Sequence, residues 1–199
     1  DGLKVTFASQ ADDLVADDGN GARDVFVCDL ATGQCERVSQ PWPGGGTGPP
    51  VVPAEASGYP QLSGNGQRVV FESLATNLVA MDTNGLGDVF LRTLGDDTTL
   101  LLSPGYAPAG KILRSHSPTL SADGARVAFV SDAQGLAAGT YPERPEVYVA
   151  TVGGPLVCAS CNALPLLPTL ASSFHPVLSA DGQRLAFQAS SLTSPEIAL

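Results

Sequence analysis

The sequence has little positive charge. Ten Lys and Arg stand against twenty Asp and Glu, and the formal net charge is −10. The basic residues form no cluster anywhere along the chain. A nucleic-acid-binding protein needs a basic face to neutralise phosphates, so we expect no nucleic-acid partner. The same charge disfavours an acidic membrane surface and favours divalent cations or basic protein surfaces as partners.

Long apolar runs and helical periodicity are absent as well. No run approaches the roughly 18 apolar residues that a membrane helix needs, so no transmembrane segment is predicted. Apolar residues nonetheless make up 43% of the 199 residues and charged residues 15%, which is typical of a folded chain that can bury a core. The 22 glycines and 16 prolines predict frequent turns.

One pattern recurs at a fixed spacing. PQLSGNGQRVVF starts at Pro60, PTLSADGARVAF at Pro118 and PVLSADGQRLAF at Pro176, so that each copy follows the last by 58 residues. The second half of the pattern also opens the chain, as DGLKVTF at residues 1–7. A fixed period of this size indicates a repeat architecture in which each copy is one supersecondary unit.

Each unit is predicted to hold four antiparallel strands. In the second unit, PQLS and the alternating RVVFES flank a GNG turn, as in a hairpin. DVFLRTL and TTLLLS then form the third and fourth strands, joined by GDD. The proline is expected to start the innermost strand, where a missing N–H costs least. The phenylalanine of each copy is expected to fill the space between neighbouring sheets; these are Phe7, Phe71, Phe129 and Phe187.

We therefore predict an all-β fold, a β-propeller of four-stranded antiparallel blades with a 58-residue repeat and about 3.5 blades. The whole chain, 1–199, is one propeller domain or segment. Its blades are expected at 1–39 (lacking a first strand), 60–103, 118–160 and, as a half blade of two strands, 176–190. Closed propellers usually have four to eight blades. We expect a segment of a longer chain, completion by another subunit, or capping inside a larger complex.

The loop before the third strand is the predicted metal site. Two copies share D-x-N-G-x-x-D, in which alternate oxygen donors and a bend-forming glycine are typical of a Ca²⁺ loop. The further carboxylates and the bidentate Glu of an EF-hand are missing, and Asx turns without an ion are the alternative. The third unit has Thr140 and Pro142 instead, so the fold itself requires no ion. The candidate ligands are Asp18, Asn20, Asp24, Asp82, Asn84 and Asp88.

The four cysteines form two local pairs, which predict disulfides and an oxidising compartment. Cys28 and Cys35 flank the turn between the third and fourth strands of the first blade. Cys158 and Cys161 form the motif CASC. A redox dithiol usually lies at a helix N-terminus, whereas this motif is expected to end a strand, which favours a structural disulfide. The pairs lie on blades separated by another blade, so a joint zinc site is excluded.

The linkers between blades are long and are the predicted partner-binding surface. Residues 40–59 are rich in Pro and Gly, and residues 103–117 and 162–175 are apolar for loops. Aromatic and aliphatic anchors dominate interfaces. The alternative is that these side chains pack over their own blades. The candidates are Trp42, Tyr106, Leu164, Leu166 and Leu167.

The pattern LS-x-x-G-x-R-[VL]-x-F, together with DVF at 24–26 and 88–90, resembles the bacterial WD-like, TolB-type β-propeller repeats. The resemblance covers essentially the whole chain. It implies a propeller exported to the periplasm or the exterior of a bacterium. No signal peptide precedes Asp1, so we expect a mature or truncated form. The pattern is specific for the fold and not for one function.

Three functions are compatible with these observations. The first is a non-catalytic exported binding or scaffold propeller, acting on protein partners within a larger assembly. The sequence has no G-x-S-x-G, P-loop or H-E-x-x-H motif, so we expect no enzymatic activity and no required cofactor. The second is the accessory propeller of an enzyme such as a peptidase, with its catalytic domain outside this segment. The third is a calcium-dependent, lectin-like ligand-binding propeller.

Overall fold

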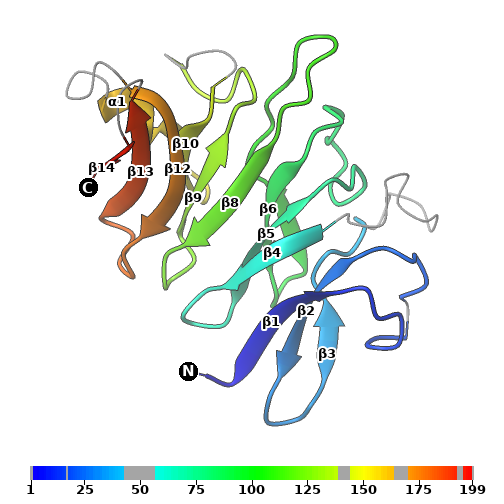
Figure 1. The fold of residues 1–199 in the computed structure, drawn as a ribbon. Helices are drawn as coiled ribbons and strands as arrows, with labels where there is room; N and C mark the ends of the chain where they lie inside the picture. The colour runs from blue at the N-terminus through cyan, green and yellow to red at the C-terminus, as the bar shows by residue number, and fades with distance from the viewer. Residues whose placement is uncertain are drawn as a thin grey trace.

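The computed structural model describes residues 2–16, 18–42, 57–138, 144–163, 170–191 and 195–198. Within them, fourteen strands form four antiparallel sheets, and the one helix spans five residues (Figure 1). The predicted all-β fold is confirmed. Each sheet is formed by strands that follow one another in the chain, so hairpins make every connection within a sheet.

The first sheet contains β1 (Lys4–Ser9), β2 (Asp24–Asp29) and β3 (Cys35–Arg37). The second contains β4 (Ser57–Leu62), β5 (Arg68–Ser73), β6 (Asp88–Thr93) and β7 (Thr98–Leu101). The third contains β8 (Ser115–Leu120), β9 (Arg126–Ser131), β10 (Glu146–Thr151) and β11 (Leu156–Cys158), and α1 (Ala159–Ala163) follows it. The fourth contains β12 (Leu170–Leu178), β13 (Leu185–Ser191) and β14 (Pro195–Ala198).

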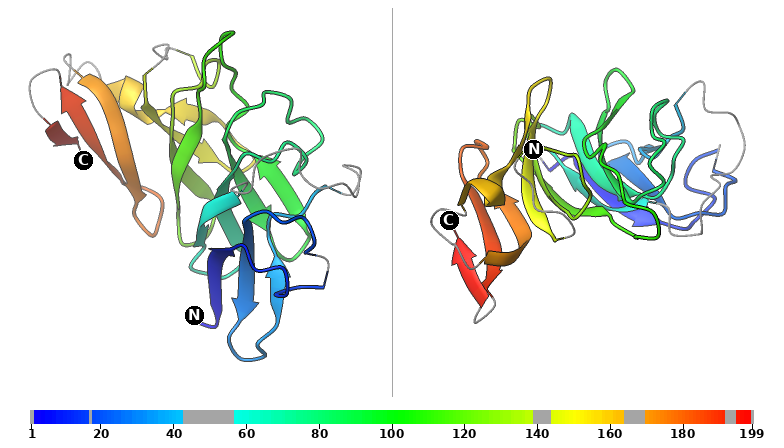
Figure 2. Two further views of the ribbon diagram at one scale, coloured as in Figure 1. Left: turned by 45° about the vertical axis from the view of Figure 1, so that its right-hand side comes forward. Right: turned by 90° about the horizontal axis from the view of Figure 1, so that it is seen from above.

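The four sheets stand beside one another in chain order (Figure 1), and Figure 2 shows the same series from two other directions. The first strands of the units adjoin along one side of the series, because β4 contacts β8 and β8 contacts β12. Strand β1 corresponds to the second strand of the repeat, and it contacts β4 directly. This order of stacked sheets is the arrangement of propeller blades.

Strand β5 explains why the sheets stack. Side chains alternate between the two faces of a strand. Val69 and Phe71 accordingly join a buried cluster with the first sheet, while Val70 between them joins a cluster with the third sheet. Phe129 is buried against the second sheet, and Phe187 against the third. The recurring phenylalanine therefore fills the space between sheets, as predicted for these three copies.

The innermost strands begin earlier than predicted. They start at Ser57, Ser115 and Leu170 rather than at the prolines, which lie inside a β-bulge. A bulge leaves one residue unpaired, so a residue without an N–H is tolerated there. The residue before each proline has a positive φ, which few side chains adopt. These residues are Tyr59 (50°), Ser117 (54°) and His175 (49°).

The last unit also differs from its predicted two strands, because β14 adds a third strand beside β13. The repeat pattern marks only the first hairpin of a unit, and the residues of β14 have no DVF motif that would identify them. Helix α1 was not predicted either. It is a single turn in which the Cys161 N–H points to the sulfur of Cys158.

Both cysteine pairs are joined as disulfides, Cys28 to Cys35 and Cys158 to Cys161. Cys28 and Cys35 lie directly opposite each other on β2 and β3. The bond thus fixes the register of a sheet whose third strand has only three residues.

Replacing Cys28 and Cys35 together by serine should lower the free energy of unfolding by about 2–3 kcal/mol, because the unfolded chain regains the freedom of a closed loop. Thermal unfolding followed by circular dichroism should show a loss of roughly 5–10 °C. Wild-type protein in reductant serves as the comparison. An unchanged transition in the double variant would contradict the stabilising role.

Candidate functional site

The two D-x-N-G-x-x-D loops have the same local structure. The backbone N–H of Ala22 donates to Asn20 Oδ1 at 2.8 Å, and that of Leu86 donates to Asn84 Oδ1 at 2.9 Å. These are Asx turns. The glycine after each asparagine has a positive φ, 66° at Gly21 and 68° at Gly85. Each asparagine therefore shapes the loop, and its oxygen is already engaged by the backbone.

The last aspartate of each motif has a structural role that the sequence analysis missed. In the first blade, Ser39 Oγ donates to Asp24 Oδ1 at 2.5 Å and accepts the Val25 N–H at 3.0 Å. This chain of bonds ties the end of the blade to the start of its third strand. The only signal in the sequence is a serine at a near-constant distance after the carboxylate.

The same arrangement recurs in the next two blades. Ser103 joins Asp88 Oδ1 at 2.6 Å to the Val89 N–H at 2.9 Å. In the third blade Ser160 donates to Glu146 and accepts the Val147 N–H. All three carboxylates are at most 3% exposed. A buried carboxylate needs a compensating positive charge or a proton.

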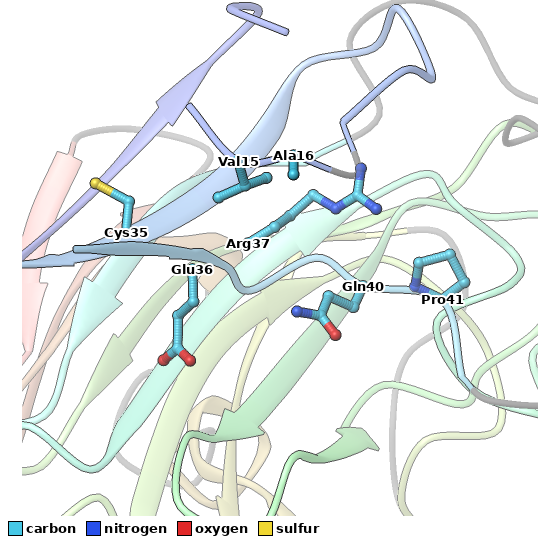
Figure 3. Close-up of a pocket in the computed structure, with 7 residues that line it drawn as sticks. All are labelled: Val15, Ala16, Cys35, Glu36, Arg37, Gln40 and Pro41. Atoms are coloured by element: carbon cyan, nitrogen blue, oxygen red, sulfur yellow. The ribbon is translucent and has the colours of Figure 1, made fainter. Parts of the chain in front are cut away.

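In the first blade that charge is supplied by Arg37. Its Nη1 atom lies 3.0 Å from Asp18 Oδ1 and 3.8 Å from Asp24 Oδ2. The same Asp24 oxygen accepts a bond from Asn20 Nδ2 at 2.7 Å. Cys35, Arg37 and the 15–16 segment line a pocket of about 290 Å³, and Figure 3 shows Arg37 on one side of β3 and Glu36 on the other. The chain itself therefore supplies a positive charge to the first predicted metal loop, which offsets one of its two carboxylate charges.

In the second blade the charges are not balanced in this way. Asp82 and Asp88 are 7% and 1% exposed. Burial, together with the nearby Asp82 carboxylate, raises the pKa of Asp88 to about 7, against hydrogen bonds from Ser103 and Asn84 that lower it. Burial also raises the pKa of Asp82. Among the ion pairs of the described residues, none includes either carboxylate.

A second cluster lies at the bulges of the innermost strands. A pocket of about 220 Å³ is lined by residues that include Arg23, Tyr59, Glu72 and Arg114. Arg23 lies over the Tyr59 ring at 5.9 Å, and Glu72 Oε1 accepts the Ser117 N–H at 2.6 Å. Burial raises the pKa of Glu72. The contact at Glu72 links the second and third blades, and Arg23 belongs to the first, so residues of three neighbouring units line this pocket.

The structure describes two of the five residues that were predicted to contact partners. Trp42 is 39% exposed, and its N–H donates to Asn77 O at 3.0 Å. Tyr106 is 57% exposed and exchanges two backbone bonds with Gln134. Leu164, Leu166 and Leu167 lie outside the described residues. The two aromatic side chains are thus held by backbone bonds to adjacent loops while their rings remain accessible.

In one further cluster the possible ligand atoms are spaced as in a metal site, but other bonds account for the arrangement. Glu146, Cys158 and Cys161 place ligand atoms within 4.8 Å of one another. Both sulfurs are joined in a disulfide, so neither is a thiolate ligand. Glu146 is instead paired with Arg144 and Ser160.

Comparisons with known proteins support the fold. No protein-family model matches the chain, and no curated protein matches it significantly. Among solved structures, it is similar to a TolB-type protein from Agrobacterium tumefaciens, at a TM-score of 0.56 and 12% identity over 96% of this chain and 51% of that one. TolB from Acinetobacter baumannii has a TM-score of 0.50 and 17% identity over 96% of this chain and 38% of that one. The fold is that of a TolB-like β-propeller.

The trilobed protease from Pyrococcus furiosus has a propeller domain, described as having an open velcro topology, that is similar too. Its TM-score is 0.54 at 11% identity, over 99% of this chain and 50% of that one. This chain thus spans about half the length, or less, of these three solved structures. At such identities the likeness concerns the fold alone.

His116, which lies on β8, makes the stability of the folded protein depend on pH. Burial lowers its pKa below 6.5, Arg114 and His175 lower it further, and Asp132 opposes them. The unfolded chain therefore takes up a proton near pH 6.5 that the folded chain does not. This contribution to stability is present above about pH 6.5 and is lost as the pH falls through the folded-state value.

The His116→Gln variant should lose less stability than the wild type between about pH 7.5 and pH 5, because glutamine does not titrate. Urea unfolding at both pH values measures the difference. His175→Gln is the comparison: it removes an exposed histidine and only the smallest of the causes that lower the pKa of His116, so most of the pH dependence should remain. Identical pH dependence in wild type and His116→Gln would contradict the assignment.

Proposed function

We propose that this protein is a non-catalytic binding or scaffold propeller that acts within a larger propeller assembly. The observation that supports the proposal best is the outer face of the first sheet. Val5 is 41% exposed, whereas the equivalent Val69 and Val127 are fully buried. Phe7 is half-buried, whereas Phe71 and Phe129 are fully buried.

The other blades indicate what covers such a face. Each equivalent valine and phenylalanine packs against the preceding sheet, whose contribution is apolar, such as Val70 and Leu91 facing Phe129. The occupant that fits Val5 and Phe7 is therefore a further propeller blade. Full burial of such a side chain is worth roughly 1.5–3 kcal/mol, so covering the parts of Val5 and Phe7 that are still exposed would stabilise such a contact by roughly 1–3 kcal/mol in total.

The polar groups of the described blades support a non-catalytic role. A nucleophilic serine needs a base that is free to accept its proton. Ser39, Ser103 and Ser160 each donate to a buried carboxylate and also accept a backbone N–H. These bonds serve the blade itself. The proposal accordingly assigns binding to the sheet face and the linkers.

Two features support export. The chain holds two disulfides and no free cysteine, which suits an oxidising compartment. The similar folds include TolB-type proteins. Among the described residues, none of the helices has the length and apolar character to span a membrane. The disulfides and the likeness to TolB-type folds support our proposal that the protein lies in the periplasm or at the exterior of a bacterial cell.

Thiol labelling of a Val5→Cys variant tests the proposed contact, because the native cysteines are all in disulfides. In the native protein, labelling at position 5 should be roughly tenfold slower or more than at Met81→Cys, since a covering blade must open first. Met81 is 81% exposed and serves as the matched control. Equal labelling rates at the two positions would refute a covered face.

Alanine substitution of Trp42 and Tyr106 tests the linkers. Each change should weaken association with protein partners about fivefold or more if the aromatic ring is an interface anchor. Circular dichroism should stay unchanged, because both rings are substantially exposed. The size of the native assembly, measured by analytical ultracentrifugation, is the readout. Met81→Ala is the control, and unaltered association in both aromatic variants counts against the linkers.

A further inference from the structure

The buried carboxylate that begins the third strand has an arginine partner in two blades. In the first blade, Arg37 lies beside Asp18 and Asp24. In the third blade, Arg144 donates through Nε to Glu146 Oε1. The arginines come from different places, one after the carboxylate on β3 and one just before it. These two blades therefore compensate the charge at this position separately, each with its own arginine.

The second blade has neither arginine. Arg37 lies opposite Phe26 in the first sheet, and the residue opposite the equivalent Phe90 is Leu101. The residue two positions before Asp88 is Leu86, where the third blade has Arg144. Yet this blade keeps two buried acids, at 7% and 1% exposure. Two buried carboxyl groups therefore lie near enough to interact, and no ion pair of the described residues includes either of them.

The unsatisfied atoms identify where a cation belongs. Asp82 Oδ1 and Asp88 Oδ2 are buried and have no hydrogen-bond partner. The equivalent atoms in the first blade are Asp18 Oδ1 and Asp24 Oδ2, which are the two oxygens nearest to Arg37 Nη1. Buried oxygens of this kind are rarely left unpaired in folded proteins. In the first blade Arg37 bonds Asp18 Oδ1, Asn20 Nδ2 bonds Asp24 Oδ2, and the guanidinium is the charge partner of both carboxylates. In the second blade both equivalent oxygens are open.

We propose that the second blade binds a divalent metal ion between Asp82 and Asp88, at the place that the Arg37 guanidinium takes in the first blade. Two carboxylates supply oxygen ligands and a charge of −2, which match a hard cation such as Ca²⁺. Asn84 is not among the ligands, because its oxygen accepts the Leu86 N–H and its amide donates to Gly105 O at 3.0 Å. Asn84 positions the loop instead.

The two loops that share the D-x-N-G-x-x-D motif therefore differ in ion binding. In the first loop Arg37 already fills the position, so Asp18 and Asp24 bind no ion. The second loop binds one ion per chain. The ion stabilises the blade from within, because the Asp88 carboxylate also holds Ser103 at the end of the same blade.

Calcium titration of the chelator-treated native protein is the first test. Isothermal titration calorimetry should give one ion per chain, and the melting temperature should rise by about 5–10 °C at a hundredfold excess over Kd. Asp82→Asn should abolish both effects while leaving the Asp88–Ser103 bond in place. No binding by the wild type would overturn the proposal and leave a proton on Asp88 as the compensation. Undiminished binding by Asp82→Asn would overturn it as well.

Exchanging the arginine between blades gives a sharper test. Leu101→Arg should abolish calcium binding and its thermal shift, because the guanidinium takes the position of the ion. Arg37→Leu should raise the stoichiometry from one ion to two, because it opens the first loop in the same way. The second variant keeps the test valid if Leu101→Arg fails to fold. Unchanged stoichiometry in Arg37→Leu would contradict the equivalence of the two loops.

Discussion

Packing between neighbouring sheets is the constraint on which this structure depends. No blade has a core of its own, because each strand sends alternate side chains to the sheet before it and the sheet after it. Phe71, Phe129 and Phe187 lie in these shared spaces, and the valine two residues earlier lies there too in β5 and β9. A change in one sheet therefore alters the packing of another. This dependence explains why the sequence pattern persists from copy to copy.

The same constraint controls the polar groups. Stacking the sheets buries the carboxylate that starts each third strand, and a buried carboxylate is costly unless it is bonded and its charge is compensated. Ser39, Ser103 and Ser160 supply equivalent bonds in three blades. The blade closes through these bonds, so the carboxylate cannot simply be exchanged for an apolar residue. Which side chain compensates the charge of this carboxylate, however, depends on the residues that lie near it in each blade.

The sequence predicts the fold well because its signals are local. Turn residues, alternation and the 58-residue spacing define strands, hairpins and blades without any knowledge of distant contacts. The bulges were missed because proline was expected at a strand start, and a positive φ at Tyr59 or His175 follows from the packed sheet and not from residue preference. The third strand of the last unit was missed because it has no motif.

The candidate site was predictable only in its outline. The motif located both loops and the Asx turns, but it could not indicate which loop has an arginine partner. Arg37 reaches Asp18 across the sheet, so their proximity depends on the register of β2 and β3 and not on spacing along the chain. At the equivalent place Leu101 is apolar and packs between the first two sheets. One residue on the fourth strand thus decides the charge balance of a loop that precedes the third.

This division suggests how such a repeat protein acquires different functions in different blades. Positions that stack the sheets are constrained, because a substitution there affects two blades at once. The charge partner of the buried carboxylate is less constrained, since Arg37 and Arg144 satisfy it from different strands and loops. A blade that lacks this arginine keeps its packing and leaves its buried acids without that charge partner. Functional differences between blades are therefore expected where the fold requires a compensating charge but does not specify the residue that provides it.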